Sequence, residues 1–255
     1  MALRRAGCGP TTATITTVSR AHSHQRGATR HSTIFASQAR SRTSEFVSLV
    51  PPRGAPYAHV QRIDGPPRIH LDVVGSIERD TARLEELGAT RVYRGAAWQA
   101  MASPAGLPFC VCEESWPHAR PDAPTWPDGH RSRLVQVTVD VPARRYEAEL
   151  EFWRGATGWS DEEVDAPEFH RLVHRAESPH QLLVQRLGPD DTAEWARAHL
   201  DLGTDDIDAE VARVQSLGAE FLWPGNGFVA LRDPLGLPFC VTANQPALEE
   251  TAGPT

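Results

Sequence analysis

Two patterns of apolar positions organise the chain after residue 44. From Leu134 to Val141, valines occupy every second position and mostly polar residues the others, which is the period of a strand with one buried face. From Ile207 to Leu217, apolar residues recur every three or four positions, the period of a helix packed on one side. Acidic residues before this helix can cap its start, and Gly218 suits its end. The patterns predict a mixture of strands and helices that follow one another along the chain.

The last long stretch, His199 to Val241, reads as a strand, a helix and three short strands. The same arrangement occurs earlier: HLD is found at 70–72 and at 199–201, and GLPFCV at 106–111 and at 236–241. The copies are offset by 129 residues at the first match and by 130 at the second. An internal duplication of this length predicts two similar halves, each closing with one strand–helix–three-strand unit.

This unit, its HLD opening and the DPLG turn before its last strand resemble the vicinal-oxygen-chelate (VOC) superfamily, specifically its glyoxalase-like proteins of actinobacterial type. The resemblance covers about residues 45–243 and implies an α+β fold of tandem βαβββ units. It also implies that paired units form a cup whose concave face holds a site. The superfamily includes metal-dependent isomerases, dioxygenases and proteins that sequester drugs, so the resemblance selects a fold and leaves the activity open.

We divide the chain where these patterns change. Residues 1–44 carry seven arginines and no acidic residue, and we expect a basic disordered leader or an artefact of the gene start. Residues 45–114 lack a recognisable opening strand and helix, which predicts an incomplete, truncated first glyoxalase-like domain, whereas residues 133–244 should form a complete second one. The proline-rich segment 115–132 should be a linker, and 245–255 a disordered tail.

Composition narrows the range of functions. No apolar run approaches the roughly 18 residues of a membrane span, and we expect a cytoplasmic protein without a membrane partner. All 26 basic residues are arginine, so a Schiff-base lysine and a phosphate-loop lysine are excluded. The arginines of the leader are not interleaved with aromatic residues before Phe35, and we expect no nucleic-acid partner. The four cysteines lack the spacing of a zinc or redox motif.

Strand alternation predicts which residues line the second cup. Helices should cover the valine and leucine faces of the strands, so the other faces turn inward. The residues expected to bind a ligand there are Gln136, Thr138, Gln185, His199, Asp201, Trp223 and Cys240.

Several of these residues have more than one interpretation. His199 can form a structural hydrogen bond with Gln185 or Gln136, contact a ligand, or act as a base or metal ligand. Cys240 can be a small core residue or a nucleophile. Asp201, like Asp72 in the first half, can cap a turn or bind an arginine at the rim.

His170 and His174 are four residues apart on a strand, so they do not form a helical zinc pair. We expect them in solvent or on the cup wall.

Metal-dependent relatives use four ligands on the first and last strands of paired units, usually His, Gln or Glu. The resemblance carries these positions onto Gln136, His199, Cys240 and, within one residue, Gln185. A thiol and amides in place of glutamates suit neither a hard divalent cation nor a tetrahedral zinc site well. We therefore expect no metal and no cofactor, and the first half leads to the same expectation.

Three functional hypotheses follow. The first is a metal-free glyoxalase-like protein that binds a small apolar or aromatic molecule in the second cup; a homodimer is compatible with it. The second is an enzyme, a lyase, isomerase or dioxygenase of the superfamily that uses His199 as base or metal ligand. The third is a degenerate chain derived from a parent with an intact first half. His199 is the one candidate catalytic residue.

Overall fold

The computed structural model describes residues 12–20, 38–41, 46–51, 56–63, 65–113, 121–162, 164, 166–173 and 178–244. The first half contains β1 (Thr12–Arg20), β2 (Gln38–Ser41), β3 (Phe46–Val50), β4 (Ala58–Ile63), β5 (Arg68–Val74), α2 (Ile77–Glu86), β6 (Thr90–Arg94), β7 (Trp98–Ala102) and β8 (Pro108–Cys112). The second half contains β9 (Ser132–Val141), a short 3-10 helix η2 (Ala143–Arg145), α3 (Tyr146–Thr157), β10 (Ser160–Glu162), β11 (Phe169–Val173), β12 (Gln181–Arg186), β13 (Arg197–Thr204), α4 (Ile207–Ser216), β14 (Glu220–Gly225), β15 (Phe228–Arg232) and β16 (Pro238–Thr242).

These strands form two eight-stranded sheets of the same design. The first has the order β2-β3-β4-β1-β5-β8-β7-β6, and the second β10-β11-β12-β9-β13-β16-β15-β14. In each sheet two units meet at a central antiparallel pair, β1 with β5 and β9 with β13. The predicted α+β fold of tandem βαβββ units is confirmed. None of the helices in the described ranges is long and apolar enough to span a membrane.

The opening strand of the first half lies inside the segment that we expected to be a disordered leader. Thr12–Arg20 forms β1, which pairs in parallel with β4 and antiparallel with β5. The boundary drawn at residue 44 therefore needs correction, because β1 occupies the place in the first sheet that β9 occupies in the second. Residues 14–18 were compatible with an edge strand in the sequence, but threonines outnumber apolar residues along the segment and give only a weak strand signal. Residues 21–37, where a helix would follow, lie outside the described residues.

The apolar face of β9 packs against α3, as its alternation predicts. The helix is amphipathic and ends at Gly158, whose φ of 64° is left-handed and therefore suits glycine. Asp206 caps the start of α4, as the sequence predicts. Its carboxylate accepts a hydrogen bond from the Ala209 N–H at 3.0 Å. The buried residues between β9 and α3 include Val137, Val139, Val141, Tyr146, Leu150 and Trp153.

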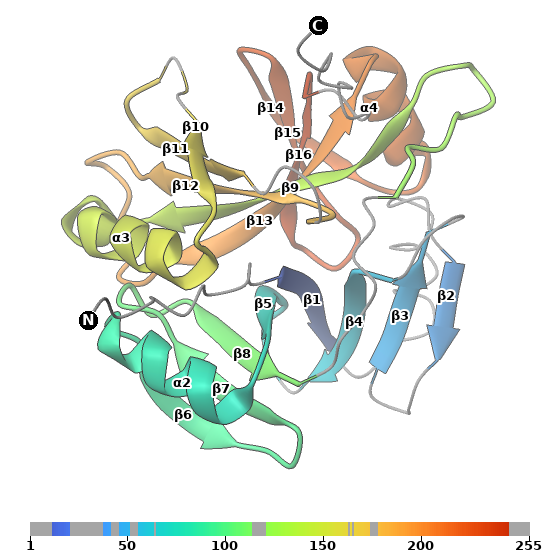
Figure 1. Cartoon of the computed structure of the whole chain (residues 1–255). Helices are drawn as coiled ribbons and strands as arrows, with labels where there is room; N and C mark the ends of the chain where they lie inside the picture. Colours follow the sequence, from blue (N-terminus) through green and yellow to red (C-terminus); the bar gives the residue numbers. More distant parts are fainter. Residues whose placement is uncertain are drawn as a thin grey trace, which may run out of the picture.

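The two halves share one hydrophobic core, and α3 lies at their boundary (Figure 1). The ring of Phe109 on β8 is 5.7 Å from that of Phe152 and 5.6 Å from that of Trp153. Glu149 of α3 is fully buried and accepts hydrogen bonds from the Ala105 N–H at 2.7 Å and from the Trp153 indole at 2.8 Å. Because a buried carboxylate is costly without partners, these bonds fix how α3 sits on the first half.

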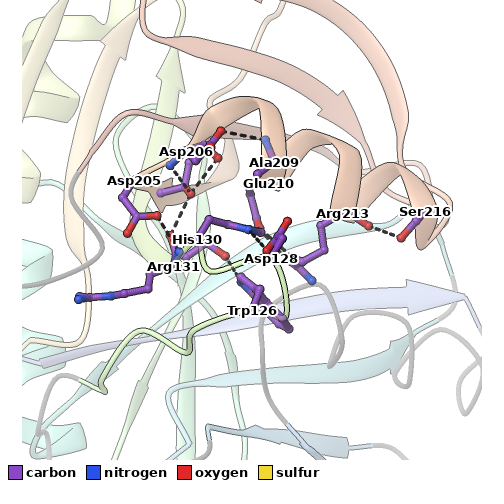
Figure 2. Close-up of polar contacts among 12 residues, drawn as sticks. Trp126, Asp128, His130, Arg131, Asp205, Asp206, Ala209, Glu210, Arg213 and Ser216 are labelled. Atoms are coloured by element: carbon purple, nitrogen blue, oxygen red, sulfur yellow. Dashed lines mark hydrogen bonds and ion pairs between the residues drawn. The ribbon is translucent and has the colours of Figure 1, made fainter.

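A polar network whose centre, His130 and Glu210, is buried joins the segment before β9 to α4 (Figure 2). His130 lies 2.6 Å from Asp128 through Nδ1 and 2.8 Å from Glu210 through Nε2. Arg213 donates to both oxygens of Glu210, at 2.7 and 2.6 Å, and its guanidinium stacks 3.8 Å from the centre of the Trp126 ring. We call these five residues the α4 network. The described part of the expected linker, 121–131, is thus held against the second half.

The α4 network should make the stability of the protein depend on pH. Burial alone would lower the pKa of His130, but the hydrogen bonds to Glu210 and Asp128 outweigh it and raise the pKa above 6.5. A histidine with a raised folded-state pKa stabilises the fold fully below its ordinary pKa, and this contribution is lost as pH rises through the folded-state value. We expect His130→Gln to lower the free energy of unfolding by about 1–3 kcal/mol near pH 6, and by less well above the folded-state pKa. Urea denaturation at both pH values measures this difference.

A double-mutant cycle with Glu210→Gln provides the control. In the Glu210→Gln background, His130→Gln should lower the free energy of unfolding by nearly the same amount at the two pH values, because the Glu210 charge is absent. If His130→Gln lowered the free energy of unfolding equally at both pH values in the protein that retains Glu210, the raised pKa of His130 would be contradicted.

Candidate functional site

The face of the second sheet opposite α3 is polar, and the pairing of its strands brings the site together. Asp201 of β13 lies opposite Gln136 of β9 and Cys240 of β16, while His199 lies opposite Thr138. Paired residues point to the same face of a sheet, so strand register alone gathers these side chains. We define the C-terminal cup as the residues Gln136, Thr138, Asp140, Gln181, His199, Asp201 and Cys240.

Asp201 is the buried acceptor at the centre of the C-terminal cup. One of its oxygens, Oδ2, accepts hydrogen bonds from the Thr138 hydroxyl at 2.6 Å and the Gln136 amide at 2.5 Å. The Gln136 oxygen accepts in turn from the Gln181 amide at 2.9 Å. Burial raises the pKa of Asp201, and these donors compensate for the water it has lost. The residue is 2 % exposed, so the expectation of a turn cap or a rim contact for Asp201 is wrong.

His199 lies between two carboxylates. Its Nδ1 is 3.0 Å from Asp140 Oδ2, and its Nε2 is 3.5 Å from Asp201 Oδ1. Burial alone would lower the pKa of His199, but the charge and hydrogen bond of Asp140, followed by the charge of Asp201, raise it well above 6.5. The two carboxylates therefore favour the protonated, imidazolium form of His199. The expected pairing with Gln185 or Gln136 is wrong, because the partners of the ring are carboxylates.

The thiol of Cys240 completes the cluster. Its sulfur, a His199 nitrogen and an Asp201 oxygen all lie within 4.8 Å of one another. Burial raises the pKa of Cys240, although the hydrogen bond with His199 acts in the opposite direction. Because the thiolate is the reactive form, a thiol with a raised pKa is a weak nucleophile. This geometry favours Cys240 as a neutral polar group.

The other predicted residues occupy more peripheral positions. Gln185 of β12 lies opposite Asp140, so it shares the cup face at the side of the His199 partner. Trp223 lies on the edge strand β14, two strands from Cys240 on the same face, with 55 % of its surface exposed. Strand register thus brings both residues to the predicted face, while the direct contacts of His199 come from Asp140, Asp201 and Cys240.

His170 does not lie on the cup wall. It pairs with Val184, and its Nδ1 is 3.3 Å from the hydroxyl of Tyr146, the first residue of α3. Position 170 therefore belongs to the face that the helix covers, and the expectation of a cup-wall role is wrong for it, while the residue is half-buried. His174 lies outside the described residues.

Two members of the cup were missed in the sequence. The period of two that identified Gln136 and Thr138 extends to Asp140, so this signal was available. Gln181 carried no comparable signal, because only the parallel pairing of β12 with β9 places it opposite Gln136.

The cup does not reproduce the ligand set that metal-dependent relatives use. Cys240 offers a thiol with a raised pKa, Gln136 directs its oxygen to Gln181, and both nitrogens of His199 face carboxylates. A hard divalent cation prefers several oxygen ligands and an open coordination position. The residues present do not fit such a metal.

Two cavities lined by described residues lie away from the polar cluster. One of about 440 Å³ opens at the start of α4 beside Asp206 and Phe228, and one of about 380 Å³ lies beside Ile77 and Tyr93 at the start of α2. They occupy equivalent places in the two repeats, between a helix start and the following hairpin. Their position follows from how each unit packs, and neither brings together a cluster like that of His199.

Asp140 should control the charge of His199. We expect Asp140→Asn to lower the pKa of His199, because the amide can still accept a hydrogen bond but carries no charge. NMR titration of the imidazole resonances measures the pKa directly. Asp191→Asn is a matched control: Asp191 accepts from Arg197 at 2.8 Å, and Arg197 in turn lies 3.7 Å from Asp140. An unchanged pKa in Asp140→Asn, or an equal fall in the control, would contradict this role.

Comparisons with known proteins identify the family. The sequence profile described as glyoxalase-like domain matches residues 16–112 and 136–242, one match in each half. The first match begins within β1, in agreement with the corrected boundary. A search of curated proteins found no match.

Several solved structures share the fold at low identity. The Mn(II)-bound glyoxalase from Novosphingobium aromaticivorans is 16 % identical with a TM-score of 0.65, and the match covers 90 % of this chain and 80 % of that one. The 2,2',3-trihydroxybiphenyl 1,2-dioxygenase from Sphingomonas wittichii strain RW1 is 14 % identical with a TM-score of 0.62, and the match covers 92 % of this chain and 90 % of that one. The 2,3-dioxygenase LapB from Pseudomonas sp. KL28 is 10 % identical with a TM-score of 0.59, and the match covers 96 % of each chain. With a family match in both halves, the chain belongs to the glyoxalase-like domain family of the VOC superfamily.

Proposed function

We propose that the C-terminal cup binds a small organic molecule without a metal, and that protonated His199 donates a hydrogen bond to it from Nε2, whose 3.5 Å distance to Asp201 is longer than the 3.0 Å hydrogen bond between Nδ1 and Asp140. The observation that carries this proposal is the Asp140–His199–Asp201 arrangement. The side chain of His199 is 14 % exposed, whereas that of Asp201 beneath it is 4 % exposed. The imidazolium is thus the charged group of the cluster that a bound molecule reaches first.

The cost of this arrangement supports a functional role. Burying two carboxylates and an imidazolium is unfavourable, and apolar residues of similar size often stabilise a protein as well or better. On the opposite face of the sheet, β9 and β13 carry such apolar residues, Val139 and Leu200. A charged cluster kept on the cup face is the pattern typical of a binding or catalytic site.

The surroundings of His199 define the class of ligand. Leu183 of β12 pairs with Thr138 and adds an apolar surface to the cup face, and Trp223 offers an aromatic one at its edge. A small aromatic or apolar body carrying one hydrogen-bond acceptor, such as a carboxylate, phenolate or carbonyl oxygen, matches this combination.

A second candidate function, acid–base catalysis, is favoured by one specific observation. Asp140 holds Nδ1 of His199, which leaves Nε2 as the proton-carrying atom on the side of Asp201 and Cys240. A carboxylate that orients an imidazole in this way is found in enzymes that use histidine as general acid or base. With its raised pKa, His199 would act as the acid. The activity would be a lyase or isomerase reaction.

A thermal-shift screen with small aromatic acids, phenols and ketones tests the proposal. A ligand at 100 times its Kd should stabilise the protein by about 2.7 kcal/mol. The stabilisation should disappear in His199→Ala and persist in His70→Ala, the equivalent substitution in the first half. Incubation of each hit with the protein, followed by NMR of the small molecule, separates binding from turnover.

Two results would contradict the proposal. One is that every hit stabilises His199→Ala as well as the unmodified protein. The other is a transition metal that co-purifies with the protein and is lost in Cys240→Ser or His199→Ala, because such a metal would lie in the C-terminal cup.

A further inference from the structure

We propose that the cavity at the start of α2 binds the carboxylate group of a small organic acid. This cavity, which we call the α2 cavity, has a volume of about 380 Å³ and is lined by residues of α2, β6 and β7. Its counterpart at the start of α4, which we call the α4 cavity, has a volume of about 440 Å³. Both volumes suit a small molecule, so the residues that line each cavity decide what it can bind.

The two cavities differ in charge. The segment 205–208 contributes three aspartates to the α4 cavity, which no arginine lines among the described residues. The α2 cavity is lined by two arginines, Arg91 and Arg94, and by one acidic residue, Glu78. Two positive charges against one negative charge favour an anion, and one with a single charge balances them best.

A β-bulge places both arginines on the side of α2. In a regular strand, residues three apart point to opposite faces. The register of β6 with β7 shifts between Arg91 and Tyr93, so that Arg91 lies opposite Met101 and Arg94 lies opposite Gln99. Met101 and Gln99 are two residues apart and both are buried, and Gln99 lines the cavity together with residues of α2. Arg91 and Arg94 therefore share the face against which α2 packs (Figure 1).

Both guanidinium groups retain donors for a ligand. Glu85 accepts from Arg91 Nε at 2.8 Å and from Arg91 Nη2 at 2.6 Å, which fixes this guanidinium and leaves Nη1. The exposed Arg94 forms no ion pair with another described residue. A planar guanidinium binds the two oxygens of a carboxylate side by side, so Arg94 is the principal anion-binding group that we assign.

The first turn of α2 adds backbone donors to the cavity. The first hydrogen bond along this ten-residue helix runs from the Asp80 N–H to the Ser76 carbonyl, at 2.8 Å. Ile77 and Glu78 line the cavity, and their N–H groups precede that bond, so they have no partner within the helix. Unpaired N–H groups and the helix dipole both favour an anion at this end.

A buried hydroxyl in the wall of the cavity points to a ligand independently of the helix end. Thr81, one turn further along α2, lines the cavity and is 1 % exposed. Its Oγ1 has no hydrogen-bond partner among the described residues. A buried polar atom without a partner destabilises a protein, so its presence needs an explanation. Rotation about χ1 exchanges the hydroxyl with the methyl group, and Thr81 can then donate to a group bound in the cavity.

The second half shows that the fold does not need these polar residues. Its hairpin of β14 and β15 has the same bulge, between Phe221 and Trp223. At the repeat offset of 130, the positions of Arg91, Arg94 and Thr81 are occupied by Phe221, Pro224 and Val211. The donors of the α2 cavity are therefore a property of the first half alone.

The remaining surface of the α2 cavity suits a short apolar body. Ile77 and Val92 line it beside the donors. A carboxylate on a small aliphatic chain can place its oxygens at Arg94 and the helix start while its chain contacts these two residues. A phosphate dianion fits less well, because Glu78 lies in the wall and Glu85 already neutralises Arg91.

NMR titration with propionate tests the proposal. Spectra of the ¹⁵N-labelled full chain are recorded at constant ionic strength, with chloride replaced by propionate. The backbone amides of Ile77 and Glu78 should shift and reach saturation. The equivalent amides of Ile207 and Asp208 in α4 are an internal control, and they should shift little because aspartates line the α4 cavity.

Three substitutions test the assigned donors. Arg94→Gln should weaken propionate binding roughly 10- to 100-fold, as expected for loss of a charge-assisted hydrogen bond. Thr81→Val, which introduces the residue type of the second half, should weaken it roughly 3- to 10-fold while urea denaturation shows a protein at least as stable as the parent. Arg232→Gln is the matched control, because Arg232 is an exposed arginine on β15, 3.8 Å from Glu220, and its loss should leave binding unchanged.

Several results would overturn the proposal. They are the absence of saturable shifts at Ile77 and Glu78, equal shifts at the start of α4, or unchanged affinity in Arg94→Gln. Inorganic phosphate is titrated in parallel, and tighter binding of phosphate than of propionate at the same amides would overturn the assignment of a carboxylate.

The outcome is independent of the function proposed for the C-terminal cup. His199→Ala should leave the propionate shifts of α2 unchanged, and their loss in this variant would contradict binding in the α2 cavity. Arg94→Gln should in turn leave intact any ligand-induced stabilisation that depends on His199. Failure of either proposal therefore leaves the other standing.

Discussion

The antiparallel pairing of β9 with β13 is the constraint on which the rest of the second half depends. Because side chains alternate along a strand, this register sends Val137, Val139 and Leu200 towards α3 and sends Thr138 and His199 to the opposite face. A shift of one residue would exchange the two faces and place carboxylates in the apolar core. The hydrophobic core therefore fixes the register, and the register fixes the polar cluster.

Three of the groups of buried polar residues are each compensated in their own way. In the C-terminal cup, hydroxyl, amide and imidazole groups surround Asp201. At the boundary of the halves, Glu149 is satisfied by a backbone N–H and an indole, and in the α4 network an arginine and a histidine share Glu210. The last two tie together segments that are 44 and 80 residues apart, so they stabilise the tertiary arrangement. The cluster in the C-terminal cup links strands that backbone hydrogen bonds already join. Its side-chain bonds are therefore not needed to hold the strands together, which favours a functional role.

The duplication lets one half be compared with the other as a natural control. Both halves keep the His-x-Asp pair and a cysteine on the last strand, with closely similar geometry. They differ beside the histidine: Asp140 lies opposite Arg197 in the second half, whereas Val18 lies opposite Arg68 in the first. Divergence after duplication has therefore acted on the edges of the cluster, while its centre and the fold beneath it stayed the same.

The sequence by itself determined the repeating units, the helix caps and the face on which the site residues lie, because periodicity, turn chemistry and internal similarity are local properties of the chain. It also placed Gln136, Thr138, His199, Asp201 and Cys240 on one face. Only the tertiary structure decided that Thr12–Arg20 is a central strand, since that segment is stabilised by its neighbours β4 and β5 and not by its own apolar content. The tertiary structure also decided the hydrogen-bond partners of each site residue. A bond such as that of His199 with Asp140 depends on the register between strands that are distant in sequence.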